Sequence, residues 1–139
     1  IFEGKGELSE KNQERINYLH NSNNYDLPNN IRPKCHQDGH TYPSVYGRIY
    51  GDKPVGTITT GFCSPGRGRY IHPNEPRMIT IREAARVQSF PDWYFKDIEA
   101  LGLTKSHLQK IIGDAVPPMM VFPLIISLVE SIDERIKIR

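Results

Sequence analysis

The sequence predicts an α+β fragment in which a small β-rich segment is followed by helices. Residues that favour β-structure cluster at 42–62, whereas helical periods with capping residues dominate from residue 80 onward. Hydrophobic residues make up only 37% of the 139 residues, and eleven Gly and eleven Pro indicate many turns. This composition fits either a loop-rich domain or a piece of a larger protein, and we favour the piece.

Residues 1–30 are expected to form a surface helix and a linker. Helical character runs over residues 7–20, where Ser9 stands at the N-cap position and Ile16 and Leu19 share a face. Residues 21–30 are rich in Asn and contain a proline, so turns are expected there rather than regular structure.

The β-rich segment is expected within residues 42–62. Val45, Tyr46, Ile49 and Tyr50 favour β-structure, as do residues 57–60. Residues 52–54 separate the two runs with a turn, so a hairpin or two neighbouring strands is predicted. Residues 64–69 then form a mobile basic loop.

A well-capped helix is predicted to begin after Thr80. The Thr80 hydroxyl can accept from the backbone N–H of Glu83, whose carboxylate can reach back, which makes a capping box. Pro91 is expected to stop this helix. Four residues share its inner face, namely Ile81, Ala84, Ala85 and Gln88.

Two more helices are expected towards the C-terminus. Thr104 caps a short helix whose inward residues are Leu108, Ile111 and Ile112. Pro117 and Pro118 can start the last helix, which Pro123 should weaken. Its apolar face recurs at three- and four-residue steps: Phe122, Ile125 or Ile126, Val129, Ile132 and Ile136. The apolar stretch 116–129 looks too short to span a bilayer, and no signal peptide is seen, so a cytoplasmic protein without a membrane partner is expected.

Charge and cysteine content exclude little by themselves. The net charge is only +2, but basic residues prevail between residues 41 and 82, which suits either phosphate contact or a solvated face. Cys35 and Cys63 form no disulfide framework. No metal site is expected, because the spacing of the possible ligands matches no standard zinc finger: Cys35, His36, Asp38, His40, Cys63 and His72.

Two runs carry a family resemblance. Residues 77–92 read Arg-Met-Ile-Thr-Ile-Arg-Glu-Ala-Ala-Arg-Val-Gln-Ser-Phe-Pro-Asp, and residues 113–118 read Gly-Asp-Ala-Val-Pro-Pro. They resemble the ninth and tenth conserved blocks of DNA cytosine-5 methyltransferases, with Ile79 in place of the usual Leu and Asp114 in place of the usual Asn. Residues 46–48 and 52–60 look like the end of that family's target-recognition region. The resemblance covers about residues 42–129 and leaves residues 1–40 outside it.

The resemblance implies a fold and a domain plan. The parent would be an S-adenosylmethionine-dependent methyltransferase of Rossmann-like α/β fold, whose catalytic sheet is mostly absent from this chain. Residues 31–76 would belong to the DNA-binding target-recognition region. Residues 77–139 would form the helical C-terminal segment that packs on the catalytic domain, and its apolar face would here be covered by a second copy, as a homodimer, or by the helix at 7–20.

The resemblance also assigns site residues. Thr57 and Ile58 would approach double-stranded DNA, with Arg48, Arg67 and Arg69 on phosphates or base edges, although Arg67 and Arg69 also suit an exposed loop. Gly113, Asp114 and Val116 would touch the rim of the S-adenosylmethionine pocket, with Asp114 acting first as a helix cap. A structural supporting role falls to the helix that follows Thr80, through Thr80, Arg82, Glu83 and Arg86.

The reactive blocks of the family are not found in the sequence. A complete enzyme would extrude the target cytosine and attack carbon 6 with a cysteine thiolate. The family's nucleophile follows a proline, whereas Cys35 follows Lys34 and Cys63 follows Phe62. The chain alone is therefore expected to be inactive and to need the missing catalytic half. A non-enzymatic DNA-binding remnant and a structural interaction domain are the alternatives.

Overall fold

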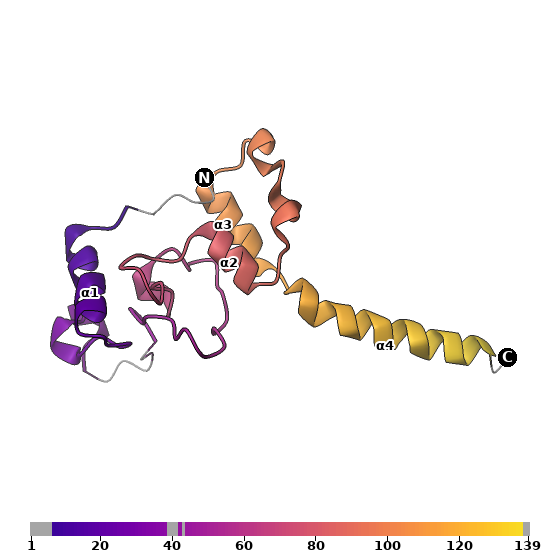
Figure 1. Cartoon of the computed structure of the whole chain (residues 1–139), viewed down its shortest axis with the longest axis horizontal. Coiled ribbons are helices and arrows are strands. Elements are labelled where there is room, and N and C mark those ends of the chain that lie inside the picture. The colour runs from indigo at the N-terminus through magenta and orange to yellow at the C-terminus, as the bar shows by residue number, and fades with distance from the viewer. Residues whose placement is uncertain (1–6, 39–41, 43, 138–139) are drawn as a thin grey trace.

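A computed structural model describes residues 7–38, 42 and 44–137. Its α-helices are α1 (Glu10–Asn21), α2 (Ile81–Val87), α3 (Lys105–Asp114) and α4 (Pro118–Lys137), shown in Figure 1. Short 3-10 helices lie between them: η1 (Asn29–Ile31), η2 (Lys34–His36), η3 (Pro65–Arg67), η4 (Asp92–Phe95) and η5 (Ile98–Leu101).

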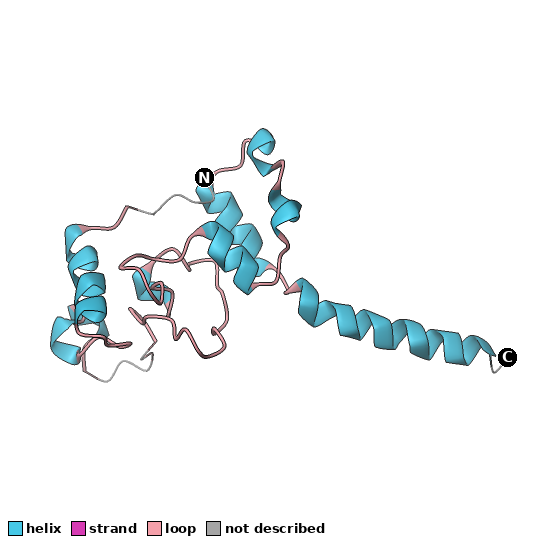
Figure 2. Ribbon diagram, in the orientation of Figure 1, coloured by secondary structure: helices cyan, strands magenta, loops and turns pink. Residues whose placement is uncertain are grey.

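The predicted β-rich segment is wrong for the residues that the structure describes, which contain no strand (Figure 2). Two isolated bridges remain, a parallel one between Arg48 and Ile71 and an antiparallel one between Ile71 and Met78. Val45 and Ile49 are buried as their β-preference suggests, but Tyr46 between them has a left-handed φ of 56°, which interrupts extended backbone. A two-stranded ribbon is marginal without a third strand, so these residues pack as turns instead.

One hydrophobic core joins the N-terminal and central parts of the chain. Ile16 and Leu19 of α1 are fully buried, as are Phe62 and Ile71 in the loops. Burying such side chains stabilises the fold by roughly 1.5–3 kcal/mol each. The prediction of a helix at 7–20 is confirmed from Glu10 onward, and α1 contributes its apolar stripe to this core.

The predicted capping box at Thr80 and the predicted N-cap at Thr104 are both confirmed. Thr80 Oγ1 accepts from the Glu83 N–H at 3.2 Å, and the Glu83 carboxylate accepts from the Thr80 N–H at 2.8 Å. Thr104 caps α3 in the same way, with His107 as the reciprocal partner. The four residues predicted for the inner face of α2 are all buried, Gln88 included.

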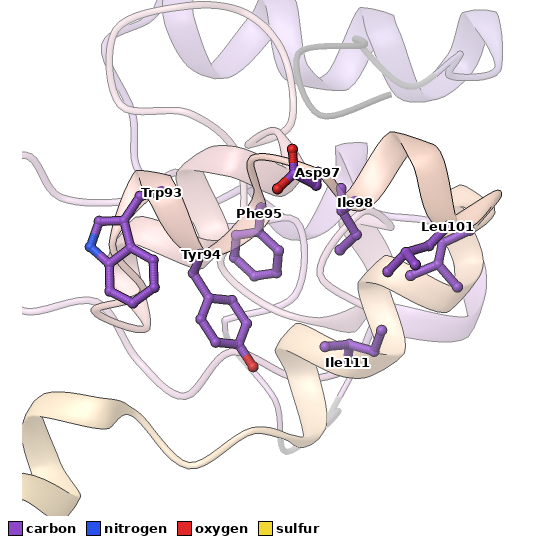
Figure 3. A pocket seen from close by; sticks show the side chains of 8 residues that line it. Trp93, Tyr94, Phe95, Asp97, Ile98, Leu101 and Ile111 are labelled. Carbon is purple, nitrogen blue, oxygen red and sulfur yellow. The ribbon is translucent and has the colours of Figure 1, made fainter.

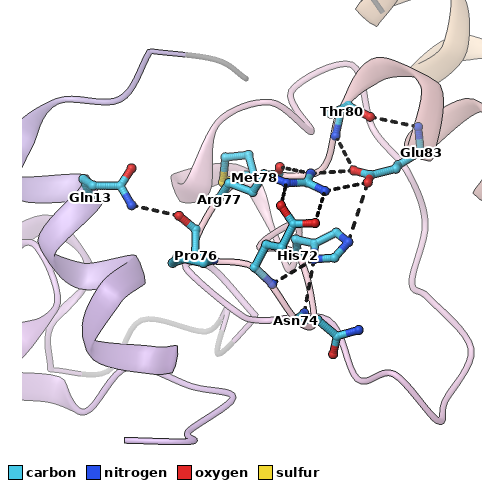
Figure 4. A network of polar contacts seen from close by, with 9 residues as sticks. Gln13, His72, Asn74, Pro76, Arg77, Met78, Thr80 and Glu83 are labelled. Carbon is cyan, nitrogen blue, oxygen red and sulfur yellow. Dashed lines mark hydrogen bonds and ion pairs between the residues drawn. The ribbon is translucent and has the colours of Figure 1, made fainter. Parts of the chain in front are cut away.

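Glu83 also holds the centre of a polar network (Figure 4). Arg77 donates to both carboxylate oxygens of Glu83 at 2.7 Å, and its Nε donates to Glu75 at 2.8 Å. The Arg77 hydrogen bonds lower the pKa of Glu83 to about 2. His72 Nε2 lies 3.6 Å from Glu83, and burial together with Arg77 lowers the His72 pKa, so this ring is neutral at pH 7. Gln13 ties α1 to the same loop by donating to the Pro76 carbonyl at 2.8 Å.

The other supporting arginines predicted on α2 make ion pairs with η4. Arg86 donates twice to Asp92, at 2.9 Å and 2.7 Å, and Arg82 lies 3.8 Å from the same carboxylate. Both Arg86 and Asp92 are exposed, so this pair contributes little to stability.

Helix α4 extends away from the rest of the molecule (Figure 1). It begins at Pro118 as predicted and tolerates Pro123 inside. Its apolar side chains are exposed, Phe122 at 60% and Ile125 at 53%. The expected cover by the helix at 7–20 is wrong, because α1 lies at the opposite end and buries its own apolar residues in the core.

By length and composition, the longer stretch Lys105–Asp133, which includes the apolar residues 116–129, is apolar enough to cross a membrane. The stretch comprises α3 and most of α4, and the residues between Asp114 and Pro118 interrupt the two helices.

We predict that Glu83→Gln destabilises the chain by roughly 2 kcal/mol at pH 7, since one charge partner of Arg77 is lost. The pKa of Glu83 falls from an ordinary 4.5 to about 2 on folding, so its stabilisation is present above pH 4.5 and is lost as the pH falls towards 2. The difference between wild type and variant should therefore shrink in acid. Urea unfolding followed by circular dichroism at pH 7 and in acid measures it.

The matched control is Glu75→Gln, which removes the more exposed carboxylate from the same arginine and should cost less than about 1 kcal/mol. Equal losses for the two variants would contradict the central place of Glu83.

Candidate functional site

A cavity of about 360 Å³ lies where three segments of the chain meet. The first segment is residues 55–58, the second is the end of α2, and the third is the turn from α3 to α4. The residues lining it are Val55, Gly56, Thr57, Ile58, Val87, Gln88, Gly113, Ala115, Pro117 and Met120. The structure thus brings together the runs at 52–60, 77–92 and 113–118 that the sequence singled out.

Gly113 brings the end of α3 against the backbone of the 57–60 segment. A Cβ at this position would lie 2.4 Å from the Thr60 nitrogen and 2.6 Å from the Thr59 carbonyl carbon. Backbone atoms cannot move aside as a flexible side chain would, so glycine is required for this close approach. The predicted rim residue Gly113 is therefore in contact with the predicted DNA segment.

Tyr70 holds the other side of that segment. Its hydroxyl donates to the Thr57 carbonyl at 2.9 Å and accepts from the Thr59 N–H at 3.3 Å. The Tyr70 ring is buried, and Gly68, with a φ of 155°, lies against it so closely that a Cβ would be 2.6 Å from a ring carbon. Thr57 is left exposed, whereas Ile58 is only 2% exposed and anchors the segment in the core.

The Arg48 side chain is buried and bonds to groups of the protein itself. Its side chain is 9% exposed, its Nε donates to the Pro73 carbonyl at 2.7 Å, and its NH1 donates to Asn23 at 3.1 Å. The guanidinium lies 4.9 Å from the centre of the Tyr25 ring. This placement suits support of the fold rather than contact with a phosphate.

Arg69 is also held by protein groups, whereas Arg67 is exposed. Arg69 donates to the carbonyls of Tyr25 at 2.9 Å and Arg48 at 3.0 Å and pairs with Asp26. It lies over Tyr50 at 4.7 Å, and Tyr50 stacks on Tyr25. Among the three predicted DNA-binding arginines, Arg67 in η3 is the one with an exposed side chain.

Asp114 does not cap the last helix, which corrects that interpretation. It is the final residue of α3, and its carboxylate accepts from Lys110 at 2.7 Å across one helical turn. The N-terminus of α4 is served instead by Ser89, whose hydroxyl accepts from the Met119 N–H at 3.1 Å. Val116, the remaining predicted rim residue, is 60% exposed.

Gln88 bonds across to the turn that follows α3. Its side-chain nitrogen donates to the Ile112 carbonyl at 3.0 Å and to the Ala115 carbonyl at 3.4 Å, and the residue is 7% exposed. The sequence placed Gln88 on the inner face of α2 but did not predict this bond. Two features of the sequence could have indicated this bond. Gln88 is a polar residue on an otherwise apolar helix face, and Pro117 and Pro118 lack the N–H groups that would bond to carbonyls at the end of α3.

A second cavity of about 360 Å³ lies between η4, η5 and α3 (Figure 3). Phe95 forms its buried wall, whereas Trp93 and Tyr94 are exposed. Ile111, predicted to face inward, is 42% exposed and lines this cavity, because the inward face of α3 is taken by Leu108 and Ile112.

The cysteines are free, Cys35 exposed and Cys63 partly buried. Burial raises the pKa of the Cys63 thiol, which disfavours the nucleophilic thiolate. In the part of the chain that the structure describes, no three His, Cys, Asp or Glu residues gather as metal ligands. His40 lies outside the described residues.

The sequence profile of the family described as C-5 cytosine-specific DNA methylase matches residues 3–130, so the expectation that residues 1–40 lie outside the resemblance is wrong. The chain belongs to this family.

Relatives of this chain come from bacteria and plants. It is 46% identical to the type II methyltransferase M1.BsuMI of Bacillus subtilis over 126 residues, which cover 89% of this chain and 28% of that protein. It is 37% identical to the type II methylase M.HgiDII of Herpetosiphon aurantiacus over 82% of this chain and 33% of the relative. DNA (cytosine-5)-methyltransferase 2 of Arabidopsis thaliana is 38% identical over 70% of this chain and 6% of its own length. The chain therefore spans a third or less of the length of each of these three relatives.

We predict that Gly113→Ala destabilises the chain by about 3 kcal/mol, because the added Cβ would overlap backbone atoms at Thr60. Gly56→Ala is the matched control, since a Cβ there meets nothing within 4 Å and should change stability by about 0.5 kcal/mol or less. Chemical denaturation of the two variants measures both effects. Equal stability of the two variants would show that the α3 terminus does not lie on the 57–60 segment.

Proposed function

We propose that this chain is the C-terminal portion of a DNA cytosine-5 methyltransferase. It contributes DNA target recognition and one edge of the S-adenosylmethionine site, and the reactive groups come from a catalytic half outside this sequence. The observation that carries the proposal is the junction cavity, where the 55–58 segment, the end of α2 and the 113–117 turn meet. Family membership and the small share of each relative that the chain covers support it.

In this proposal residues 31–76 read DNA through a supported segment. Thr57 and Arg67 are exposed and make the contacts, Thr57 next to the duplex and Arg67 on a phosphate. Ile58, buried below Thr57, fixes the segment in place. Arg48 and Arg69 support this segment indirectly, because they join the Tyr25–Tyr50 stack to the surrounding loops.

In the same proposal the 113–116 turn borders the cofactor. S-adenosylmethionine supplies the methyl group when bound. Val116 offers an exposed apolar side chain and Asp114 an exposed carboxylate, which suits a hydroxyl or ammonium group at one edge of such a ligand. Lys110 beside Asp114 offsets the negative charge that the acid would otherwise place near the methionine carboxylate. These residues fit an edge of the cofactor rather than a complete pocket.

Residues 77–139 would join this region to the catalytic half. Helix α4 exposes a long apolar surface, of which Phe122, Leu124, Ile125 and Leu128 are members. Exposed apolar surface of this extent marks an interaction site. We propose that the catalytic half covers it in the cytoplasm, with a second copy of the chain as the alternative cover and no membrane involved.

The chain alone is expected to transfer no methyl group to duplex DNA, because burial raises the pKa of the Cys63 thiol and neither Cys35 nor Cys63 follows a proline as the family's nucleophile does. Tritium transfer from labelled S-adenosylmethionine to DNA measures this. Activity should return when the protein is produced with its catalytic half, as one polypeptide or two. Transfer by the isolated chain would contradict the proposal, and DNA binding without restored activity would favour the non-enzymatic remnant.

Arg67→Ala is expected to weaken binding of a mixed-sequence duplex by about three- to tenfold and to reduce the salt dependence by roughly one counterion. Arg86→Ala removes another exposed arginine, outside the DNA segment, and serves as the control. Fluorescence anisotropy at several salt concentrations measures both the DNA affinity and its salt dependence. Equal behaviour of the two variants would argue against a phosphate contact by Arg67.

A further inference from the structure

Gln88 and Ser89, which directly follow α2, form a clasp that bonds to both ends of the link between α3 and α4 (the Gln88–Ser89 clasp). Gln88 donates to the carbonyls of Ile112 and Ala115, and Ser89 accepts from the N–H of Met119. Neither residue was among the predicted site residues. Their contacts enclose the turn to which the proposed function assigns the cofactor edge, and the inference rests on that proposed function.

The link needs such bonds because its own backbone is short of donors. The last carbonyls of any helix lack partners within the helix. Here two of the next four residues are Pro117 and Pro118, which have no N–H to offer them. The Gln88 amide replaces a missing backbone donor, and its burial protects these bonds from competing water.

Ser89 occupies an unusual backbone position for its half of the clasp. Its φ of 61° is left-handed, a conformation that favours glycine. The Ser89 N–H bonds to the Arg86 carbonyl and the Phe90 N–H to the Ala85 carbonyl, both at 2.9 Å, which is the Schellman pattern of a helix end. This reversal turns the Ser89 hydroxyl towards the start of α4. A serine at this position costs conformational energy that the Met119 bond offsets.

We propose that Gln88 is a positioning residue for S-adenosylmethionine, acting through the 113–116 turn that it holds against the 57–60 segment. It touches neither cofactor nor DNA. With its donor removed, the turn loses its fixed place at the cofactor edge, whereas the 57–60 segment keeps its Tyr70 bonds and its buried Ile58. Cofactor affinity therefore falls while DNA affinity is retained.

The test compares Gln88→Met with Gln13→Met. Methionine has a similar length and no donor, and Gln13 likewise donates to a backbone carbonyl, that of Pro76 at 2.8 Å, far from the turn. Amide hydrogen exchange of the chain is measured at residues 113–116. The dissociation constant of S-adenosylhomocysteine, the kinetic constants and the DNA affinity are measured in the enzyme with its catalytic half.

For Gln88→Met the exchange at 113–116 should rise about tenfold and the dissociation constant of S-adenosylhomocysteine should rise similarly. The KM for S-adenosylmethionine should rise with it, while kcat and DNA affinity stay within about twofold. Gln13→Met should leave all of these unchanged. Unchanged exchange, or faster exchange with unchanged cofactor affinity, would overturn the positioning role while leaving the proposed function intact.

A wild-type enzyme that neither binds S-adenosylhomocysteine nor methylates DNA would instead overturn the proposed function itself.

Ser89 supplies a second pair of variants, which separates the effect of the hydroxyl from that of the backbone conformation. Ser89→Gly removes the hydroxyl but relieves the left-handed φ, whereas Ser89→Ala removes the hydroxyl and keeps the strain. Both should raise exchange at Met119, and an unchanged rate in both would refute the second half of the clasp.

Discussion

The close approach of Gly113 to the backbone of Thr59 and Thr60 is the constraint on which the rest of the site depends. It places the end of α3 directly on a segment more than fifty residues earlier in the chain. The two segments cannot approach more closely, because the contact is between backbones. The cavity at the junction exists because this contact fixes one wall and the end of α2 fixes another.

Helix α2 acts as the frame for these parts. At its start the capping box and the Arg77–Glu83 pair join it to the loop that follows the basic segment. At its end Gln88 and Ser89 join it to α3 and α4. A short helix thus carries polar contacts at both termini and apolar contacts along its inner face. The apolar side chains of α4 lie outside this frame and are exposed.

The sequence predicted those features that depend on neighbours in the chain. The capping box at Thr80, the N-cap at Thr104 and the start of α4 at a proline depend on local backbone chemistry, and the structure confirms them. The family resemblance at 77–92 and 113–118 located the segments that meet at the junction. Local rules were sufficient there, because each motif needs only residues within one helical turn.

Features that depend on distant partners were not predictable in this way. The β-propensity of residues 45–60 predicted strands, but a strand needs a partner strand to pair with. In the structure the Tyr70 hydroxyl instead forms hydrogen bonds with the Thr57 carbonyl and the Thr59 N–H. Arg48 and Arg69 are of the residue type that contacts DNA, but in the structure their guanidinium groups lie over the rings of Tyr25 and Tyr50. Asp114 looked like a cap because the sequence does not reveal that α3 continues through it or that Ser89 serves α4 from another segment.

The contact between Gly113 and Thr60 is open to direct measurement in solution by nuclear Overhauser spectroscopy on the isotopically labelled chain. The structure predicts a strong cross-peak between the Gly113 α-protons and the Thr60 amide proton, because the two backbones touch. A spectrum in which both residues are assigned and this cross-peak is absent would contradict the junction on which the proposed site is built.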